Sequence, residues 1–499
     1  MRNRKFLALI LASIVWLLLS TASPVLGEGP DLYPGVWRSG IGIKDLSGAD
    51  NTIRVLFYDA ATGAKQAYEY TTTLSAGAGI ELYLPNISSS ELAAGSYAVE
   101  VQSTGPVGVM ATNTNYDANM ADSYNAVPSA TEFFVPGIYH NHNNWWSELL
   151  VQNVNDSAVD VSIQVTGEDL VTRTPVGPVT FGPITIPAHG TRSFDTGTDT
   201  PIDFAPLGDH FRGSARVTNS QGLPMAVALL DTRVAAGSPA VQVVLSHRGT
   251  TVEDADTFLT APILYKNFNN CWRSGITVQN VDSTNAVDVR LTVRSSDGSI
   301  TATNVQTLQP GRSYEWYLPS AVFDGGATLP DQFLGAGTVE VISGSGKIVG
   351  TVLTTNYCRV KTLPTAPAGA GLALGYIMPG RTSGKAVLSA PTVYKTFGTG
   401  IWNSSLVVSN VGASAVTLEL QFASLPNSPA QYSGTMAGGV LQPGQSTEFY
   451  LPKIPQIPDQ FLGSILVTAT GAGTPAISGL VQHVNYGRGV ATVYAAPGY

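Results

Sequence analysis

One marker, Trp-x-Ser followed by alternating apolar residues and a final Asn or Asp, occurs four times in this 499-residue chain. The copies begin at Trp37, Trp145, Trp272 and Trp402, and they end at Asp45, Asn153, Asn280 and Asn410. Their spacing of 108 to 130 residues is close to the size of an ordinary domain and far longer than the repeat of a solenoid. Each copy therefore predicts a separate domain that buries its own core.

Three further markers follow in a fixed order and support a true repeat. A Glu-x-Tyr-Leu-Pro segment begins at Glu81, Glu315 and Glu448, an Asp-Gln-Phe-Leu-Gly segment begins at Asp331 and Asp459, and an Asn-Tyr pair begins at Asn115, Asn356 and Asn485. The second unit has only a weaker copy of the middle marker, at His210–Gly213. The predicted units span residues 28–130, 131–255, 256–365 and 389–499, with an Ala-, Gly- and Pro-rich linker at 366–388.

The local pattern within each unit is that of β-strands. After the third Trp marker, Val287, Val289 and Leu291 alternate with polar residues, as expected for a strand with one buried face. About seven such runs, separated by turn signals such as Asp297-Gly298, fit the third unit, which is the strand count of an immunoglobulin-like sandwich. The predicted fold is all-β: four tandem immunoglobulin-like antiparallel β-sandwich domains after a signal peptide.

The N-terminus has the features of a secretory signal. Within Met1–Gly27, Arg2, Arg4 and Lys5 precede an apolar run at residues 6–19, which is shorter than a membrane span. We expect a secreted or cell-surface protein with no membrane span after signal removal, and an uncleaved anchor is the alternative. The net charge of −9 argues against nucleic acid as a partner, because phosphate binding needs clusters of Lys and Arg.

The chain has two cysteines, Cys271 and Cys358. In an exported protein, a pair of cysteines favours one disulfide, and two buried free thiols are the alternative. Cys271 directly precedes a Trp marker and Cys358 follows an Asn-Tyr pair. The bond is therefore expected if the two marked strands are neighbours.

The layout resembles the tandem β-sandwich proteins that many bacteria export to the cell surface or the surrounding matrix. This resemblance rests on architecture and covers the whole chain after the signal. It implies surface structure, adhesion or carbohydrate contact, with partners among cell-surface or matrix components, glycans included, and with self-association as a further role. The expected molecule is an elongated string of four domains.

The four marker tryptophans are expected in the cores. Trp272, for example, has the same parity as Ile276 and Val278, so the three side chains point to one face of a regular strand. The same parity holds for Trp37, Trp145 and Trp402. Stacking of these rings on sugars is the alternative.

Trp146 has the opposite parity and occurs in one unit only. It follows Tyr139, His140 and His142 in an Asn-rich segment, and this group is the predicted binding site for a glycan or a protein. A polar loop before a strand is the alternative. The His-x-His pair has two of the ligands that a metal site needs but no third nearby, so no metal site is predicted.

No catalytic motif was found, and no cofactor is expected. There is no Gly-x-Ser-x-Gly segment, and the six histidines are dispersed. We therefore expect a non-enzymatic structural or adhesive protein. A carbohydrate-binding protein is the first alternative, and an exported enzyme with an unrecognised site is the second.

Overall fold

The computed structural model describes residues 13–17, 36–115, 120–198, 201–234, 241–269, 271–356, 372–398, 401–485, 490–496 and 498. Eight antiparallel sheets pair face to face into four β-sandwiches, which confirms the predicted all-β class. We number the sandwiches one to four along the chain.

Sandwich one contains β1 (Ser13–Leu17), β2 (Arg38–Asp45), β3 (Asn51–Asp59), β4 (Lys65–Leu74), β5 (Gly79–Tyr83), β6 (Tyr97–Ser103), β7 (Val107–Asn115), β8 (Met120–Asn125) and β9 (Val127–Pro128). Sandwich two contains β10 (Glu132–His140), β11 (Trp145–Asn153), β12 (Val159–Asp169), β13 (Thr174–Ile186), β14 (Thr191–Asp195), β15 (Phe211–Asn219), β16 (Met225–Val234) and β17 (Val241–Arg248).

Sandwich three contains β18 (Phe258–Lys266), β19 (Trp272–Asn280), β20 (Val287–Ser295), β21 (Thr301–Leu308), β22 (Ser313–Tyr317), β23 (Phe333–Ser343), β24 (Ile348–Asn356) and β25 (Leu372–Ile377). Sandwich four contains β26 (Val387–Lys395), β27 (Trp402–Asn410), β28 (Val416–Ser424), β29 (Ser433–Leu441), β30 (Ser446–Tyr450), β31 (Phe461–Gly471), β32 (Ile477–Asn485) and β33 (Val490–Ala495). In each sandwich one short 3-10 turn lies on the connection from a strand of one sheet to a strand of the other. These turns are η1 (Leu84–Asn86), η2 (Ala205–Leu207), η3 (Asp324–Gly326) and η5 (Leu451–Lys453).

Binary patterning explains the strands. In β20 the predicted apolar positions Val287, Val289 and Leu291 are buried, and the residues between them are more exposed. The first sheet of sandwich three has the strand order β18-β23-β20-β21, and the second has β22-β19-β24-β25. Sandwiches two and four repeat this order. It differs from the order of immunoglobulin constant domains, so the likeness is one of architecture.

Two details of the sequence expectation are corrected. Sandwich three has eight strands rather than about seven, and the eighth, β25, lies within the segment 366–388 that was expected to be a linker. β25 pairs with β24 along six residues. Its small residues resemble a linker in composition, but they are needed because Leu245 of sandwich two packs directly on Gly375.

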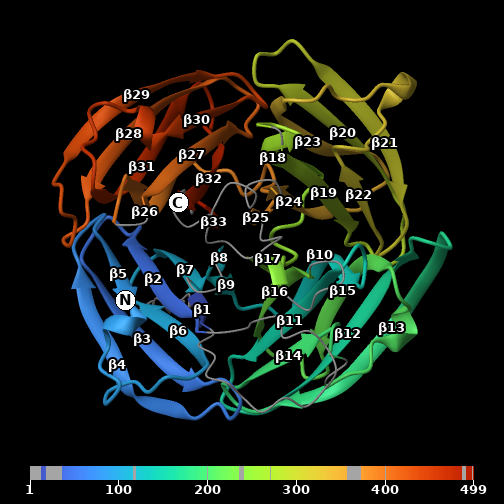
Figure 1. Cartoon of the computed structure of the whole chain (residues 1–499), viewed down its shortest axis with the longest axis horizontal. Helices are drawn as coiled ribbons and strands as arrows, with labels where there is room; N and C mark the ends of the chain where they lie inside the picture. The colour runs from blue at the N-terminus through green and yellow to red at the C-terminus, as the bar shows by residue number, and fades with distance from the viewer. Residues whose placement is uncertain are drawn as a thin grey trace, which may run out of the picture.

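The four sandwiches form a closed ring instead of the expected elongated string. Figure 1 shows them around a common centre, and the edge strands β8, β17, β25 and β33 of the four second sheets lie near that centre. We call these four the hub strands. Each hub strand packs mainly against two others, in the cyclic order β8, β17, β25, β33 and back to β8, and β8 also touches β25 across the centre.

The joint between sandwiches four and one closes the ring. The Asn125 side chain accepts a hydrogen bond from the backbone N–H of Ala495 and donates one to its carbonyl, both at 2.7 Å. The buried ammonium of Lys44 donates to Ser464 at 3.0 Å. Met110 packs into the core of sandwich four. Residues about 400 positions apart in the sequence are thus in direct contact.

The other joints repeat this arrangement with different residues. Between sandwiches two and three, the guanidinium of Arg212 lies 2.6 Å from the carboxylate of Glu315, and both side chains are largely buried. Val407 and Leu480 of sandwich four belong to the same apolar cluster as the core of sandwich three. The cores of sandwiches one and two also form one continuous cluster.

β1 lies in the segment predicted to be a signal peptide. It pairs with β6, the position that β10 holds beside β15 in sandwich two. The rest of that predicted signal lies outside the described residues, so the signal peptide stays a prediction. No helix in the described part of the chain is long and apolar enough to cross a membrane.

Candidate functional site

The serine of each Trp-x-Ser marker has a structural role. In sandwiches two to four, its hydroxyl accepts a hydrogen bond from the backbone N–H of a tyrosine in the first strand and contacts a polar side chain of the seventh strand. These sets are Tyr139, Ser147 and Asp231; Tyr265, Ser274 and Thr354; and Tyr394, Ser404 and His483. The marker serine therefore ties two sheets together across the end of each sandwich.

The final Asn of the marker also acts inside the fold. Asn280 donates from its side-chain amide to the carbonyls of Asn285 and Leu308, and its side-chain oxygen accepts from the N–H of Asp282. Asn153 and Asn410 make the same kind of contacts. Each one fixes the turn after the marker strand to the end of another strand. These repeated residues stabilise the fold, and their contacts do not indicate a ligand.

The Glu of the second marker lies at the joints. Glu315 pairs with Arg212 of sandwich two, as described above. Glu81 faces sandwich four, where burial raises the pKa of its carboxyl to about 6 against an opposing hydrogen bond from Tyr394. Sandwich two has Ser193 near this position, and it bonds Glu148 of its own sheet.

The structure reveals a repeated aromatic group at the Trp-bearing end of three sandwiches. In each, a tyrosine at the end of the first strand lies against a ring of the next loop and against the marker tryptophan, with ring centroids 5.4 to 6.1 Å apart. We call these the aromatic clusters: Tyr139, His142 and Trp145; Tyr265, Phe268 and Trp272; and Tyr394, Phe397 and Trp402. The three tryptophans are half-buried.

The marker tryptophans thus lie at the ends of the sandwiches. Trp272 packs against the core of sandwich three from its end, and Trp145 packs against a cluster shared by sandwiches two and three. Trp37 is 1% exposed and contacts Met120 and Val244, a residue of sandwich two. Trp402 packs on Tyr394.

The structure brings together part of the predicted binding group: Trp146 contacts His140, whereas His142 lies against Tyr139. The half-buried indole of Trp146 meets the ring of His140 edge to face at 5.3 Å. His140 also bonds the carbonyl of Gly208 at 2.7 Å through Nδ1. His142 instead stacks on Tyr139, and burial lowers its pKa to about 4. The two imidazoles therefore have separate partners.

Two other expectations concern cysteine and metal. Cys271 is buried, and its predicted partner Cys358 lies outside the described residues, so the bond stays a prediction. Trp272 pairs with Asn356, which places Cys271 at the strand end where Cys358 follows in sequence. No cluster of three potential metal ligands occurs within the described residues.

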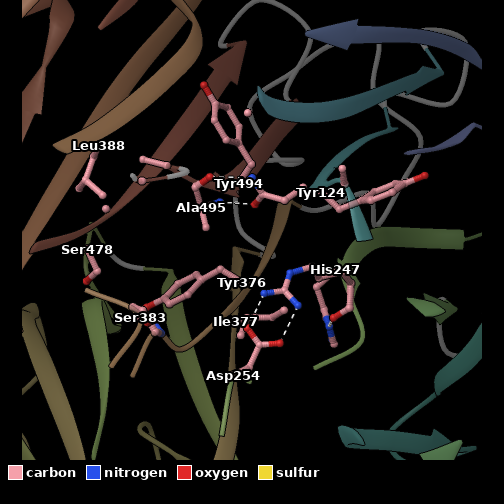
Figure 2. A pocket seen from close by; sticks show the side chains of 18 of the residues that line it. Tyr124, His247, Asp254, Tyr376, Ile377, Ser383, Leu388, Ser478, Tyr494 and Ala495 are labelled. Atoms are coloured by element: carbon pink, nitrogen blue, oxygen red, sulfur yellow. Dashed lines mark hydrogen bonds and ion pairs between the residues drawn. The ribbon is translucent and has the colours of Figure 1, made fainter. Parts of the chain in front are cut away.

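A cavity of about 290 Å³ lies on the ring axis, at the opposite end of the hub strands from the aromatic clusters. All four sandwiches line it, through Tyr124, His247, Tyr376 and Tyr494 at equivalent positions of the four hub strands. Figure 2 shows these four side chains arranged around the cavity, with Asp254 nearby. We call this space the axial cavity.

The polar centre of the axial cavity is an ion pair. Arg248 donates through its two terminal nitrogens to the two oxygens of Asp254, at 2.7 and 2.6 Å. Burial opposes the charge of Asp254, but Arg248 holds the pKa of that carboxyl below its usual value. The hydroxyl of Ser478 is buried at the wall and has no hydrogen-bond partner.

The sequence did not point to this cavity. Its lining comes from segments hundreds of residues apart, and each contributes ordinary residues. The sequence does contain one indication of this cavity, an aromatic residue at the same position of the four hub strands. The fifth residue of β8, β25 and β33 is Tyr, and His247 holds the equivalent position next to the end of β17. This alignment becomes meaningful once the four strands are known to meet on one axis.

Comparisons with known proteins do not assign a family. No family model matches the chain, and no curated protein matches it. A solved structure described as Thermotoga maritima 1070 is similar over 23% of this chain and 94% of its own, with 18% identity and a TM-score of 0.19. The Anabaena sensory rhodopsin transducer is similar over 20% and 96%, with 14% identity and a TM-score of 0.14. The viral chemokine binding protein R17 of rodent gammaherpesvirus Peru is similar over 75% and 88%, with 10% identity and a TM-score of 0.18.

Proposed function

We propose that the protein is an exported, non-enzymatic surface protein that acts as a structural or adhesive scaffold. The observation that carries the proposal is the set of three aromatic clusters, each with a half-buried tryptophan, at the Trp-bearing end of the ring. Aromatic side chains of this kind are enriched where proteins contact partners. The partners would be cell-surface or matrix components.

The closed ring supports contact at several points. The hub strands and the joints hold the clusters in fixed relative positions, because each hub strand packs against at least two others. Weak contacts at three fixed points bind far more tightly together than singly, provided that the geometry lets them engage at once. The scaffold would thus act through multivalent contact on one face.

The outer edge strands of the sheets carry features that hinder pairing with another chain, which favours contact through the aromatic clusters. β4 carries Lys65 and Glu69, and β13 contains three prolines, which are features that hinder strand addition. On β21, Thr303 bonds Asp324 of the neighbouring loop at 2.6 Å. β28 and β29 pair with an irregular register. Self-association would therefore use the aromatic clusters rather than the edges.

Substitution of the cluster rings tests the proposal. Phe268→Ala and Phe397→Ala should each reduce retention of the full protein on intact bacterial cells by several fold, and the double variant should reduce it by more than tenfold, because multivalency is lost. Val305→Ala, at an exposed rim position, is the control and should bind like the parent. Unchanged retention of the double variant would contradict the proposal.

A second candidate function, glycan binding, is favoured by Trp146. Its ring is half-buried and braced by His140, so an indole surface is held in place beside solvent. Retention on an insoluble polysaccharide that is lost in Trp146→Ala, with unchanged thermal stability, would support this function. Equal retention of the variant would exclude Trp146 as the contact.

A further inference from the structure

We propose that the exported protein binds an extended strand of another polypeptide in sandwich one, in the place that β1 occupies in Figure 1. We call this place the first-strand seat, and it lies between β6 and β9. The proposal rests on the export named in the proposed function, because removal of the predicted signal at residues 1–27 also removes β1. It does not use the aromatic clusters, so retention on cells and strand binding can fail separately.

The other three sandwiches show which strand the seat should hold. β10, β18 and β26 lie beside β15, β23 and β31, and each of them ends five to seven residues before a marker tryptophan. Counted back from Trp37, the same strand would fall within residues 22–32, across the end of the predicted signal. Cleavage after residue 27 therefore divides the segment that would complete sandwich one.

The residues that remain before the marker are poorly suited to replace this strand. The segment 28–36 contains Pro30 and Pro34, which have no backbone N–H to donate to a sheet, and it carries the charges of Glu28 and Asp31. A second copy of the chain would offer the same segment. The sequence therefore favours a different polypeptide as the occupant.

The marker serine of sandwich one gives an independent indication. In the other three sandwiches this serine accepts a hydrogen bond from the backbone N–H of a first-strand tyrosine, as Ser274 does from Tyr265. Within the described residues, the hydroxyl of Ser39 bonds Asn113 and receives no hydrogen bond from a first strand. β1 thus pairs with β6 without making the contact that a first strand makes elsewhere in the ring.

The core face of the seat requires an apolar donor. Tyr97, Val99 and Val101 of β6 belong to the core cluster and are at most 4% exposed. Their pairing partners in β1 are Leu17, Val15 and Ser13. Directly paired residues lie on the same face of a sheet, so a donor needs an apolar residue opposite Val99 to cover the core. Main-chain hydrogen bonds to β6 would supply further affinity, as in other cases of strand addition.

The other face of the seat favours a basic residue in the donor. Glu100 of β6 is partly buried, and its carboxylate accepts from Gln102 at 2.9 Å and from Tyr58 at 3.3 Å. Within the described residues it has no ion pair. In sandwich two, by contrast, an ion pair between Arg216 and Glu132 joins the first strand to its neighbour. A donor with Lys opposite Glu100 would supply the corresponding pair.

The seat also lies beside a joint of the ring. β10 packs against β19 and β24 of sandwich three, β18 against β27 of sandwich four, and β26 against β2 of sandwich one. First strands therefore form part of three joints. β9, which borders the seat, contacts β16 of sandwich two. A bound donor would thus stabilise the remaining joint as well as the sheet.

The first test is hydrogen exchange on the exported protein, after mass spectrometry has established its N-terminus. The β6 amides directed at the seat should exchange at least tenfold faster than the corresponding amides of β15, β23 and β31, because those strands keep their first-strand neighbours. Equal protection of all four strands in a protein that lacks residues 1–27 would overturn the proposal. Retention of residues 13–17 in the exported protein would also overturn it.

The second test is peptide binding. The probe is a labelled peptide with the sequence of residues 11–17 and a lysine tail for solubility. It should bind the exported protein saturably and protect β6 from exchange. The unprocessed chain, in which β1 occupies the seat, is the matched control and should bind the peptide at least tenfold more weakly. Absence of binding to the exported protein would overturn the proposal.

Variants distinguish strand binding from unspecific apolar contact. In the peptide, Val15→Asp places a charge opposite Val99 and should weaken binding at least tenfold, whereas Ile14→Lys places an ammonium opposite Glu100 and should strengthen binding several fold. Glu100→Gln in the protein should abolish that gain and leave binding of the parent peptide unchanged. Equal binding of the parent and Val15→Asp peptides would overturn the proposal. Dimers of the exported protein with a protected β6 and no peptide would assign the seat to a second copy and overturn the choice of partner.

Discussion

The two ends of the hub strands differ in how the four sandwiches use equivalent positions. At the Trp-bearing end, three sandwiches repeat the same serine contact and the same aromatic cluster. At the axial cavity, the residues that follow the four aligned aromatic positions are all different: Asn125, Arg248, Ile377 and Ala495.

Geometry explains the difference. Each aromatic cluster is built from residues of its own sandwich, so each sandwich can carry the same residues. On the axis the four copies meet, and four arginines at the position of Arg248 would repel one another within a few ångströms. A charged residue on the axis is therefore present once, with a partner, Asp254, from its own sandwich. Repeated residues thus mark the architecture, and unrepeated residues on the axis mark a candidate site.

The largest effect is expected at a joint. Glu315→Ala leaves Arg212 largely buried with only the more exposed Glu168 as its partner. Removal of one member of a buried pair costs about 3 kcal/mol, so the free energy of unfolding should fall by about that amount in urea titrations. Glu168→Ala is the control and should cost far less. Equal losses for the two variants would show that the joint adds nothing.

A smaller effect is expected for the repeated serine. Ser274→Ala removes the acceptor of the buried N–H of Tyr265 and the partner of Thr354. The loss should be about 2 kcal/mol of unfolding free energy, because buried polar groups become unpaired. Urea unfolding measures it. A neutral variant would contradict the structural role of the marker.

The third prediction uses pH to compare copies of one position. Burial raises the pKa of Asp231 to about 8, although the hydrogen bond from Ser147 opposes this. The folded chain then holds a proton that the unfolded chain has lost, so stability should fall as pH rises from about 4 to 8. Asp231→Asn should remove this slope and stabilise the protein by about 1 kcal/mol at pH 8.

Sandwich one supplies the precedent for this variant. There Asn113 occupies the equivalent position and accepts from Ser39 at 2.8 Å. Unfolding free energies at pH 5 and pH 8 decide the matter. Parallel pH profiles for parent and variant would show that Asp231 does not titrate in this range.

The smallest effect is expected at the axial cavity. Ser383→Ala removes one hydrogen bond at a partly buried position. The unfolding free energy should change by less than about 0.5 kcal/mol, as for most substitutions away from the core. A loss as large as that of Ser274→Ala would erase the contrast between architectural residues and cavity residues.

The sequence predicted the fold class because strand periodicity and markers are local signals. The alternation in β20 and the four marker strands are read from neighbouring residues. β25 was missed because Ala373 and Gly375 are small for a long-range reason, the approach of sandwich two. Composition alone does not separate that reason from a flexible linker.

The ring and the axial cavity were not predictable in the same way. The joint between sandwiches four and one depends on Asn125 bonding the backbone of Ala495, and any backbone could serve as that partner. The predicted group at Trp146 was local, and the structure does bring Trp146 and His140 together. Arg248 and Asp254 are near in sequence, but only ring closure makes them the lining of a cavity.

Small-angle X-ray scattering of the protein in solution tests the closed ring most directly. The account expects one compact particle, with a pair-distance distribution that has a single broad maximum and ends at about the width of two sandwiches and the hub between them. A long distribution with regularly spaced shoulders, as four beads in a line produce, would contradict it.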